Sequence, residues 1–117
     1  MAPTTFETHV RHQSMVAIID LQGEITTSAD AALVAAYAEA VSQRPETILL
    51  HFGAVVYINS AGIALVVGVL KRALQEHYAL AACALSVHYQ EIFRITRLTD
   101  YIQLFPDEAS ALAGLSR

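Results

Sequence analysis

The stretch of sequence that decides the fold is residues 47–64, TILLHFGAVVYINSAGIA. Residues 47–52 are mostly apolar and partly β-branched, which is typical of a strand buried on both faces. Residues 53–59 predict a short connection, and residues 60–77 predict a helix. The helix follows from apolar residues at helical spacing, namely Ile63, Val66, Val67, Leu70, Ala73 and Leu74. The stretch therefore predicts a strand, a turn and a helix, with small and polar residues at the turn.

Outward from this stretch, strand and helix patterns alternate. Upstream we expect an edge strand at 5–10, a buried strand at 15–21 and a helix at 29–41, with Thr27 and Asp30 forming a capping box. Downstream we expect strands at 80–87 and 102–105, a short helix at 88–96, and a final helix opened by Pro106. The order β-β-α-β-α-β-α-β-α predicts an α/β fold, with about four helices on a mixed sheet of about five strands. We expect residues 1–117 to form a single domain.

Composition excludes several classes of function. The seven Lys and Arg residues are scattered and the net charge is −4, so no basic face for nucleic acid is expected. Residues 47–70 carry no charged side chain, but a histidine, an asparagine, a serine and three glycines argue against a membrane span. The first residues show no signal-peptide pattern, so we expect a cytoplasmic location. Cys83, within an apolar run, is expected to be a core residue.

Enzyme motifs are not found in the sequence. It contains no GxxxxGK[ST] loop, GxGxxG, GxSxG or HExxH motif, so we expect neither an enzyme nor a cofactor. The five histidines and one cysteine are too dispersed for a metal site. His51 is the nearest candidate base for Ser60, although a half-buried histidine at a strand end is the simpler interpretation. From the residues alone, Asn59 or Ser60 could simply cap the helix.

Three motifs, in order along the chain, resemble those of the STAS domain, the sulphate transporter and anti-sigma factor antagonist family. Residues 57–64 resemble its apolar-Asp-Ser-Ser/Thr-Gly-Leu turn, residues 23–25 its Gly-Glu-Leu, and residues 92–98 its Phe-x-x-Thr-Gly-Leu segment. The sequence departs from the family pattern at several positions. Asn59 replaces Asp, and Ala61 replaces the second Ser or Thr. Thr26 and His51 stand where an Asp often occurs. Arg97 replaces a glycine at a helix end where the backbone is in the left-handed conformation.

The resemblance implies a function. It implies that Ser60 is phosphorylated and that the chain sequesters an anti-sigma factor, a serine kinase of the histidine-kinase-like ATPase type, so that a sigma factor is released. The partner-binding residues that it implies are Glu24, Thr26, Asn59, Ser60, Ala61, Gly62 and Ala64. Two alternatives stay open: an accessory subunit of a lipid-transporter ATPase, and a module that senses a small ligand. The weak first strand is the element through which a homodimer would pair.

Overall fold

The computed structural model describes residues 5–115. Its five strands form one sheet in the order β1-β2-β3-β4-β5. β1 pairs with β2 in antiparallel fashion, and the remaining neighbours are parallel, so the sheet is mixed as predicted. The elements are β1 (Glu7–Gln13), β2 (Val16–Ile25), α1 (Asp30–Val41), β3 (Thr47–Ile58), α2 (Ser60–Gln75), β4 (Ala79–Cys83), α3 (Val87–Ile95), β5 (Ile102–Phe105) and α4 (Glu108–Leu115).

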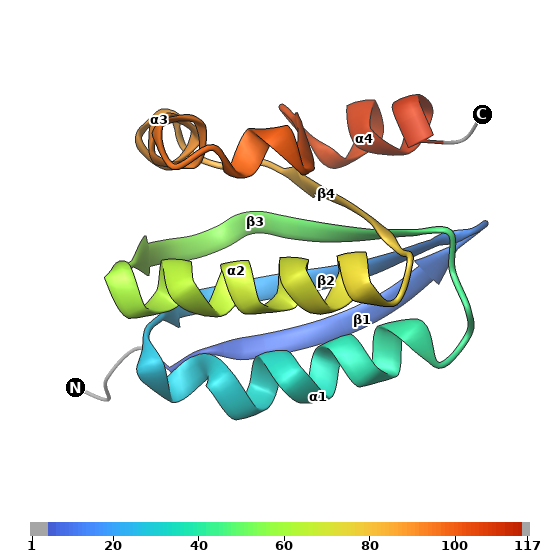
Figure 1. Cartoon of the computed structure of the whole chain (residues 1–117), viewed down its shortest axis with the longest axis horizontal. Helices are drawn as coiled ribbons and strands as arrows, with labels where there is room; N and C mark the ends of the chain where they lie inside the picture. The colour runs from blue at the N-terminus through green and yellow to red at the C-terminus, as the bar shows by residue number, and fades with distance from the viewer. Residues whose placement is uncertain (1–4, 116–117) are drawn as a thin grey trace.

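Helices cover both faces of the sheet. Figure 1 shows α1 and α2 side by side along the sheet, while α3 and α4 lie beyond β3 and β4. The larger core lies under α1 and α2, because alternate strand residues such as Ile19, Leu50 and Ala82 point to that side. The intervening residues, among them Ile18, Leu49 and Cys83, pack against α4. Cys83 is therefore a core residue as expected, and burial raises the pKa of its thiol to about 11.

The strand predicted at 47–52 was too short. β3 continues through the predicted connection to Ile58, because Val55, Val56 and Tyr57 favour extended backbone, and Val55, Tyr57 and Ile58 pair with the end of β2. β2 likewise runs past Leu21 to Ile25. Gly23, at φ 98°, lies in an irregular part of this pairing and does not end the strand. The two longest strands therefore finish together, next to the start of α2.

Other predicted boundaries change for local reasons. The capping box was wrong: residues 27–29 form a 3₁₀ turn, so α1 begins at Asp30 with no side-chain cap. The strand predicted at 80–87 ends at Cys83, since Ala84 has a φ of 63° and Ser86 caps α3. The predicted left-handed conformation at Arg97 is confirmed, with φ 66° and ψ 17°. The first strand lies at the sheet edge as expected, but it spans Glu7–Gln13.

Candidate functional site

The turn between β3 and α2 lies where four element ends meet. β2 and β3 finish there, and α1 and α2 begin there, at the left of Figure 1. The backbone N–H of Asn59 donates to the carbonyl of Ile25 at 3.3 Å, which ties the turn to the end of β2. Parallel strands finish at the same edge of a sheet, and ligand and partner sites in α/β proteins commonly lie at that edge. The predicted segments 24–26 and 59–64 are thus brought together.

Asn59 caps α2. Its backbone is extended, and its side-chain Oδ1 accepts a hydrogen bond from the backbone N–H of Gly62 at 2.8 Å. The Asn59 carbonyl accepts the first backbone bond of the helix, from Ile63, at 2.9 Å. The choice that the sequence left open is therefore decided, because Asn59 is the cap and Ser60 is the first helical residue.

Gly62 allows α2 to lie close to β2. A Cβ at this position would lie 2.0 Å from the carbonyl oxygen of Ile25 and 2.9 Å from Cγ2 of Ile58. Neither atom can move freely, since one belongs to the backbone and the other to a buried side chain. Gly62 is itself buried, so its role is to let the start of α2 pack against the strand ends.

Ser60 is exposed and its hydroxyl is not engaged. Within residues 5–115 this hydroxyl forms no hydrogen bond, because the capping bond comes from Asn59. Backbone N–H groups at the start of α2 give this end of the helix a positive partial charge. The hydroxyl is thus open to a modifying enzyme at a position that favours an added negative group.

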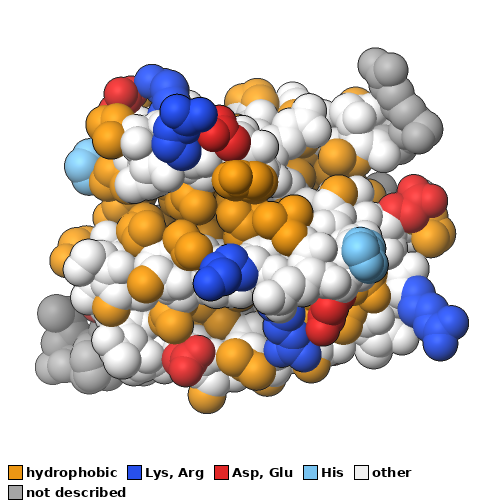
Figure 2. All heavy atoms as spheres, in the orientation of Figure 1, with side chains coloured by type: hydrophobic (Ala, Val, Ile, Leu, Met, Phe, Trp, Pro, Cys, Tyr) orange, Lys and Arg blue, Asp and Glu red, His pale blue; other side chains and the backbone are white. Residues whose placement is uncertain are grey.

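The other predicted partner residues surround the turn to different extents. Ala64 is exposed, Ala61, Glu24 and Thr26 are half-buried, and the Thr26 hydroxyl lies 3.1 Å from that of Ser28. At the end of β3, Val56 and Tyr57 are 66% and 47% exposed. Figure 2 shows further hydrophobic side chains gathered between α2 and α3 on the same side of the molecule. The turn is therefore bordered by apolar surface of the kind that protein partners contact.

His51 is not a base for Ser60. It lies in the middle of β3, seven residues before Ile58, which corresponds to on the order of 20 Å along a strand. Its Nδ1 accepts a hydrogen bond from the N–H of Gly53 at 3.0 Å, and its Nε2 lies 3.7 Å from Glu108. The half-buried position was predicted correctly, but the strand-end position was wrong because β3 is longer than expected.

Tyr89 holds the end of β3 and was missed by the sequence analysis. Its hydroxyl accepts from the N–H of Ile58 at 2.8 Å and donates to the Ile58 carbonyl at 3.3 Å. The side chain replaces a neighbouring strand there, because β4 pairs with β3 only as far as His51. One signal was available: Tyr89 lies one helical turn before the buried Phe93, on the same side of α3.

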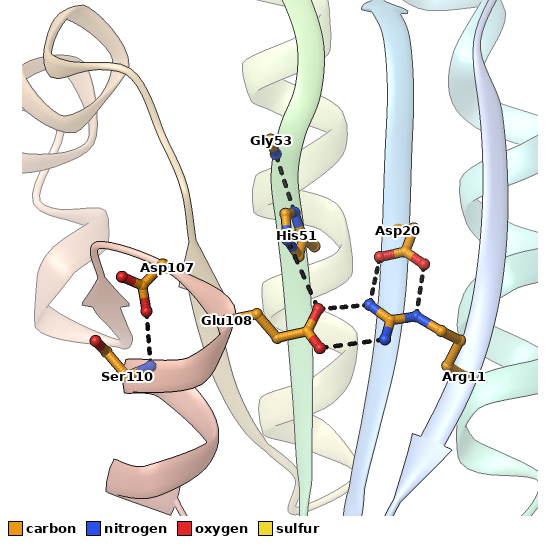
Figure 3. A network of polar contacts seen from close by, with 7 residues as sticks. All are labelled: Arg11, Asp20, His51, Gly53, Asp107, Glu108 and Ser110. Atoms are coloured by element: carbon orange, nitrogen blue, oxygen red, sulfur yellow. Dashed lines mark hydrogen bonds and ion pairs between the residues drawn. The ribbon is translucent and has the colours of Figure 1, made fainter.

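A charged cluster on the other face of the sheet was also missed. Arg11 of β1 forms a two-bond pair with Asp20 of β2, at 2.7 and 2.8 Å, and contacts Glu108 of α4 at 2.6 and 3.2 Å (Figure 3). Hydrogen bonds from Arg11 lower the pKa of both carboxyl groups. The cluster fastens the start of α4 to the sheet, and its three parts are too far apart in sequence to form a recognisable pattern.

The described side chains do not form a metal-binding cluster. The residues that the structure describes contain no group of three or more His, Cys, Asp or Glu side chains placed to hold a metal ion. A hollow of about 540 Å³ lies at the opposite end of the sheet beside Ser14, Met15 and Leu112, and a smaller one of about 150 Å³ lies beside the end of β3. Among the described helices, none combines the length and the apolar character that crossing a bilayer requires.

Comparison with known proteins identifies the fold. The family model of the STAS domain matches residues 7–111. The chain belongs to the STAS domain family. This STAS domain is 31% identical over 86 residues to "Putative anti-sigma factor antagonist BtrV" of Bordetella bronchiseptica. The aligned residues cover 74% of this chain and 72% of that protein.

Solved structures share this STAS fold. An anti-sigma factor antagonist from Mycobacterium paratuberculosis superposes with a TM-score of 0.81, at 20% identity, over 97% of this chain and 96% of that one. The Bacillus cell fate determinant SpoIIAA in its phosphorylated form superposes with a TM-score of 0.70, at 20% identity, over 95% and 99%. The resemblance to the STAS family found in the sequence is confirmed, together with the predicted fold class.

Proposed function

We propose that this STAS domain is an anti-sigma factor antagonist that works in the cytoplasm as a protein-binding regulator, not as an enzyme. Its partner is an anti-sigma factor with serine kinase activity, of the histidine-kinase-like ATPase type. Binding of that partner through the turn at Ser60 releases a sigma factor. The observation that carries the proposal is the exposed, unengaged hydroxyl of Ser60 at the start of α2.

Phosphorylation of Ser60 is the proposed switch. A phosphate adds about −1.5 to −2 charges at neutral pH. Within this chain the start of α2 stabilises that charge, because its N–H groups and helix dipole are positive there. A partner surface that buries the hydroxyl loses binding, since it must desolvate the phosphate or place it beside like charge. The chain therefore changes its affinity without refolding.

The capping residue bears on this switch. Asn59 stands where relatives of this family usually carry an acid, and it fills the capping role with a neutral amide. A neutral cap leaves the positive end of the helix available to a phosphate on the next residue. SpoIIAA, which has this fold, is known in a phosphorylated form. Both points support phosphorylation at Ser60, although Ala61 replaces the second Ser or Thr of the family turn.

Partner binding extends beyond the serine. We propose that Glu24 and Thr26 from the end of β2, with Asn59, Ala61, Gly62 and Ala64 from the turn and the first part of α2, form one docking surface. Gly62 acts indirectly, because it is buried and sets the distance between the two segments. Glu24 gives this surface an acidic group, which favours a partner with a basic residue opposite it.

The test is a binding measurement with a kinase of this type encoded in the same genome. We expect Ser60→Asp to lose binding by at least tenfold while the melting temperature stays within a few degrees. Gln75→Glu is the matched control, since it adds the same charge to an exposed position at the far end of α2. Equal binding of both variants would refute the proposed switch, whereas an unchanged chain that does not bind the kinase would favour a transporter accessory role.

A further inference from the structure

A groove runs between α1 and α2, on the side of the molecule shown in Figure 2. Its volume is about 220 Å³, and its middle part is apolar. Leu33 and Val34 line it from α1, and Leu65, Gly68 and Val69 line it from α2. Val34 is 49% exposed, although it is a large apolar side chain. The groove therefore leaves apolar surface in contact with solvent.

Gly68 lies in the middle of this groove and has no packing role within the chain. A Cβ at this position would meet no atom within 4 Å, and the residue is exposed in the interior of a helix. Glycine there destabilises a helix relative to alanine. Because glycine has no side chain, the backbone of α2 is uncovered at this position, and a second helix can approach it closely.

The two ends of the groove carry opposite charges. Asp30 lies at one end, and within residues 5–115 its carboxylate has no hydrogen-bond or ion-pair partner. Arg72 lies at the other end, with its guanidinium 4.7 Å from the centre of the Tyr37 ring and 3.5 Å from Glu76. Asp30 and Tyr37 are seven residues apart on α1, so the ends are separated by about 10 Å.

We propose that a second copy of this chain docks in this groove, related by a two-fold axis that passes near Gly68. In such an arrangement the two α2 helices run antiparallel and approach each other at Gly68. Each Asp30 then faces the Arg72 of the other copy, so that two equivalent ion pairs form. A surface with one acidic end, one basic end and a low centre is complementary to itself, as a two-fold interface requires.

The edge of β1 is the competing surface. β1 is the edge strand, and a homodimer formed through it was the expectation from the sequence. However, β1 carries Glu7, His9 and Arg11, and charged side chains on an edge strand oppose pairing with another strand. The groove between α1 and α2 is the more apolar of these two surfaces, and we therefore assign the dimer interface to it.

Charge exchange tests the arrangement. The mass of the chain is measured by sedimentation equilibrium from micromolar to millimolar concentration, with no other protein present. Asp30→Arg and Arg72→Asp each place like charges opposite one another in a dimer of that variant, so each should weaken dimerisation on the order of tenfold. Mixing the two variants restores both ion pairs, so the mixture should form a heterodimer about as readily as the unchanged chain does. A general folding defect cannot produce that rescue.

Gly68→Gln tests the close approach at the centre. The long side chain fits the monomer, because it projects into open space, but it blocks the two-fold contact. Ala35→Gln is the control on an exposed part of α1 turned away from the groove. We expect a monomer for the first variant and an unchanged dimer for the second. The proposal is overturned if the unchanged chain stays monomeric, or if a dimer forms that neither Gly68→Gln nor the charge exchange affects. None of these results bears on Ser60, since no partner protein is used.

Discussion

Replacing either of two glycines in the same helix by alanine should shift stability in opposite directions. In Gly62→Ala the new Cβ would lie 2.0 Å from the Ile25 carbonyl oxygen and 2.8 Å from its carbon, so the start of α2 must move away from β2. Such overpacking costs about 1–3 kcal/mol. Alanine recovers about 0.5–1 kcal/mol of helix propensity. We therefore expect Gly62→Ala to lower the free energy of unfolding by about 1–2 kcal/mol.

Gly68→Ala is the matched variant, since its Cβ meets nothing within 4 Å. It should raise the free energy of unfolding by about 0.5–1 kcal/mol, because only the helix propensity changes. Urea unfolding followed by circular dichroism measures both, with the slope m expected to stay constant. For a chain of this size, 1 kcal/mol corresponds to about 3–6 °C in melting temperature. If Gly62→Ala proved as stable as Gly68→Ala, the close packing of α2 against the end of β2 would be wrong.

Three further predictions concern the surroundings of the turn and the charged cluster. Asn59→Ala should destabilise the chain by about 1 kcal/mol through loss of the cap, whereas Asn59→Asp should not; thermal unfolding compares them. Tyr89→Phe should lower the free energy of unfolding by about 1–3 kcal/mol, because it leaves the buried backbone N–H of Ile58 without a partner. Amide hydrogen exchange should become faster at the end of β3 but not in β4. Hydrogen bonds from Arg11 lower the pKa values of Asp20 and Glu108. The pairing of each carboxylate with Arg11 therefore stabilises the fold at pH values above the ordinary carboxyl pKa values of 3.8 and 4.5, and this stabilisation is lost as the pH falls below them. Melting temperatures from pH 7 to pH 3 should therefore show the difference between wild type and Glu108→Gln shrinking at the acidic end.

The fold could be predicted because its signals are local. The apolar run at residues 47–52 and the helical spacing that starts at Ser60 each specify one element without reference to the rest of the chain. The length of β3 could not be predicted in the same way. Residues 53–58 become a strand through pairing with β2, and a glycine at their start suggests a loop when they are considered alone.

The candidate site could be predicted only in part. The turn at Ser60 could be predicted because small and polar residues stand between a strand pattern and a helix pattern. The resemblance to a known family then suggested a role for it. The bond from Tyr89 to Ile58 joins residues 31 positions apart, and the pair of Arg11 and Glu108 joins residues 97 apart. Polar contacts of this range depend on which strands and helices become neighbours, so a local pattern can indicate an inward side chain but cannot identify its partner.

The central claim is that Ser60 is the switch, and mass spectrometry of the intact chain tests it most directly. The purified protein is incubated with ATP and a serine kinase of the proposed type that binds it, alongside Ser60→Ala. We predict one added phosphate, located at Ser60 and absent from the variant, together with loss of kinase binding by the phosphorylated form. A kinase that binds the chain but adds no phosphate, or adds it equally to Ser60→Ala, would contradict the account.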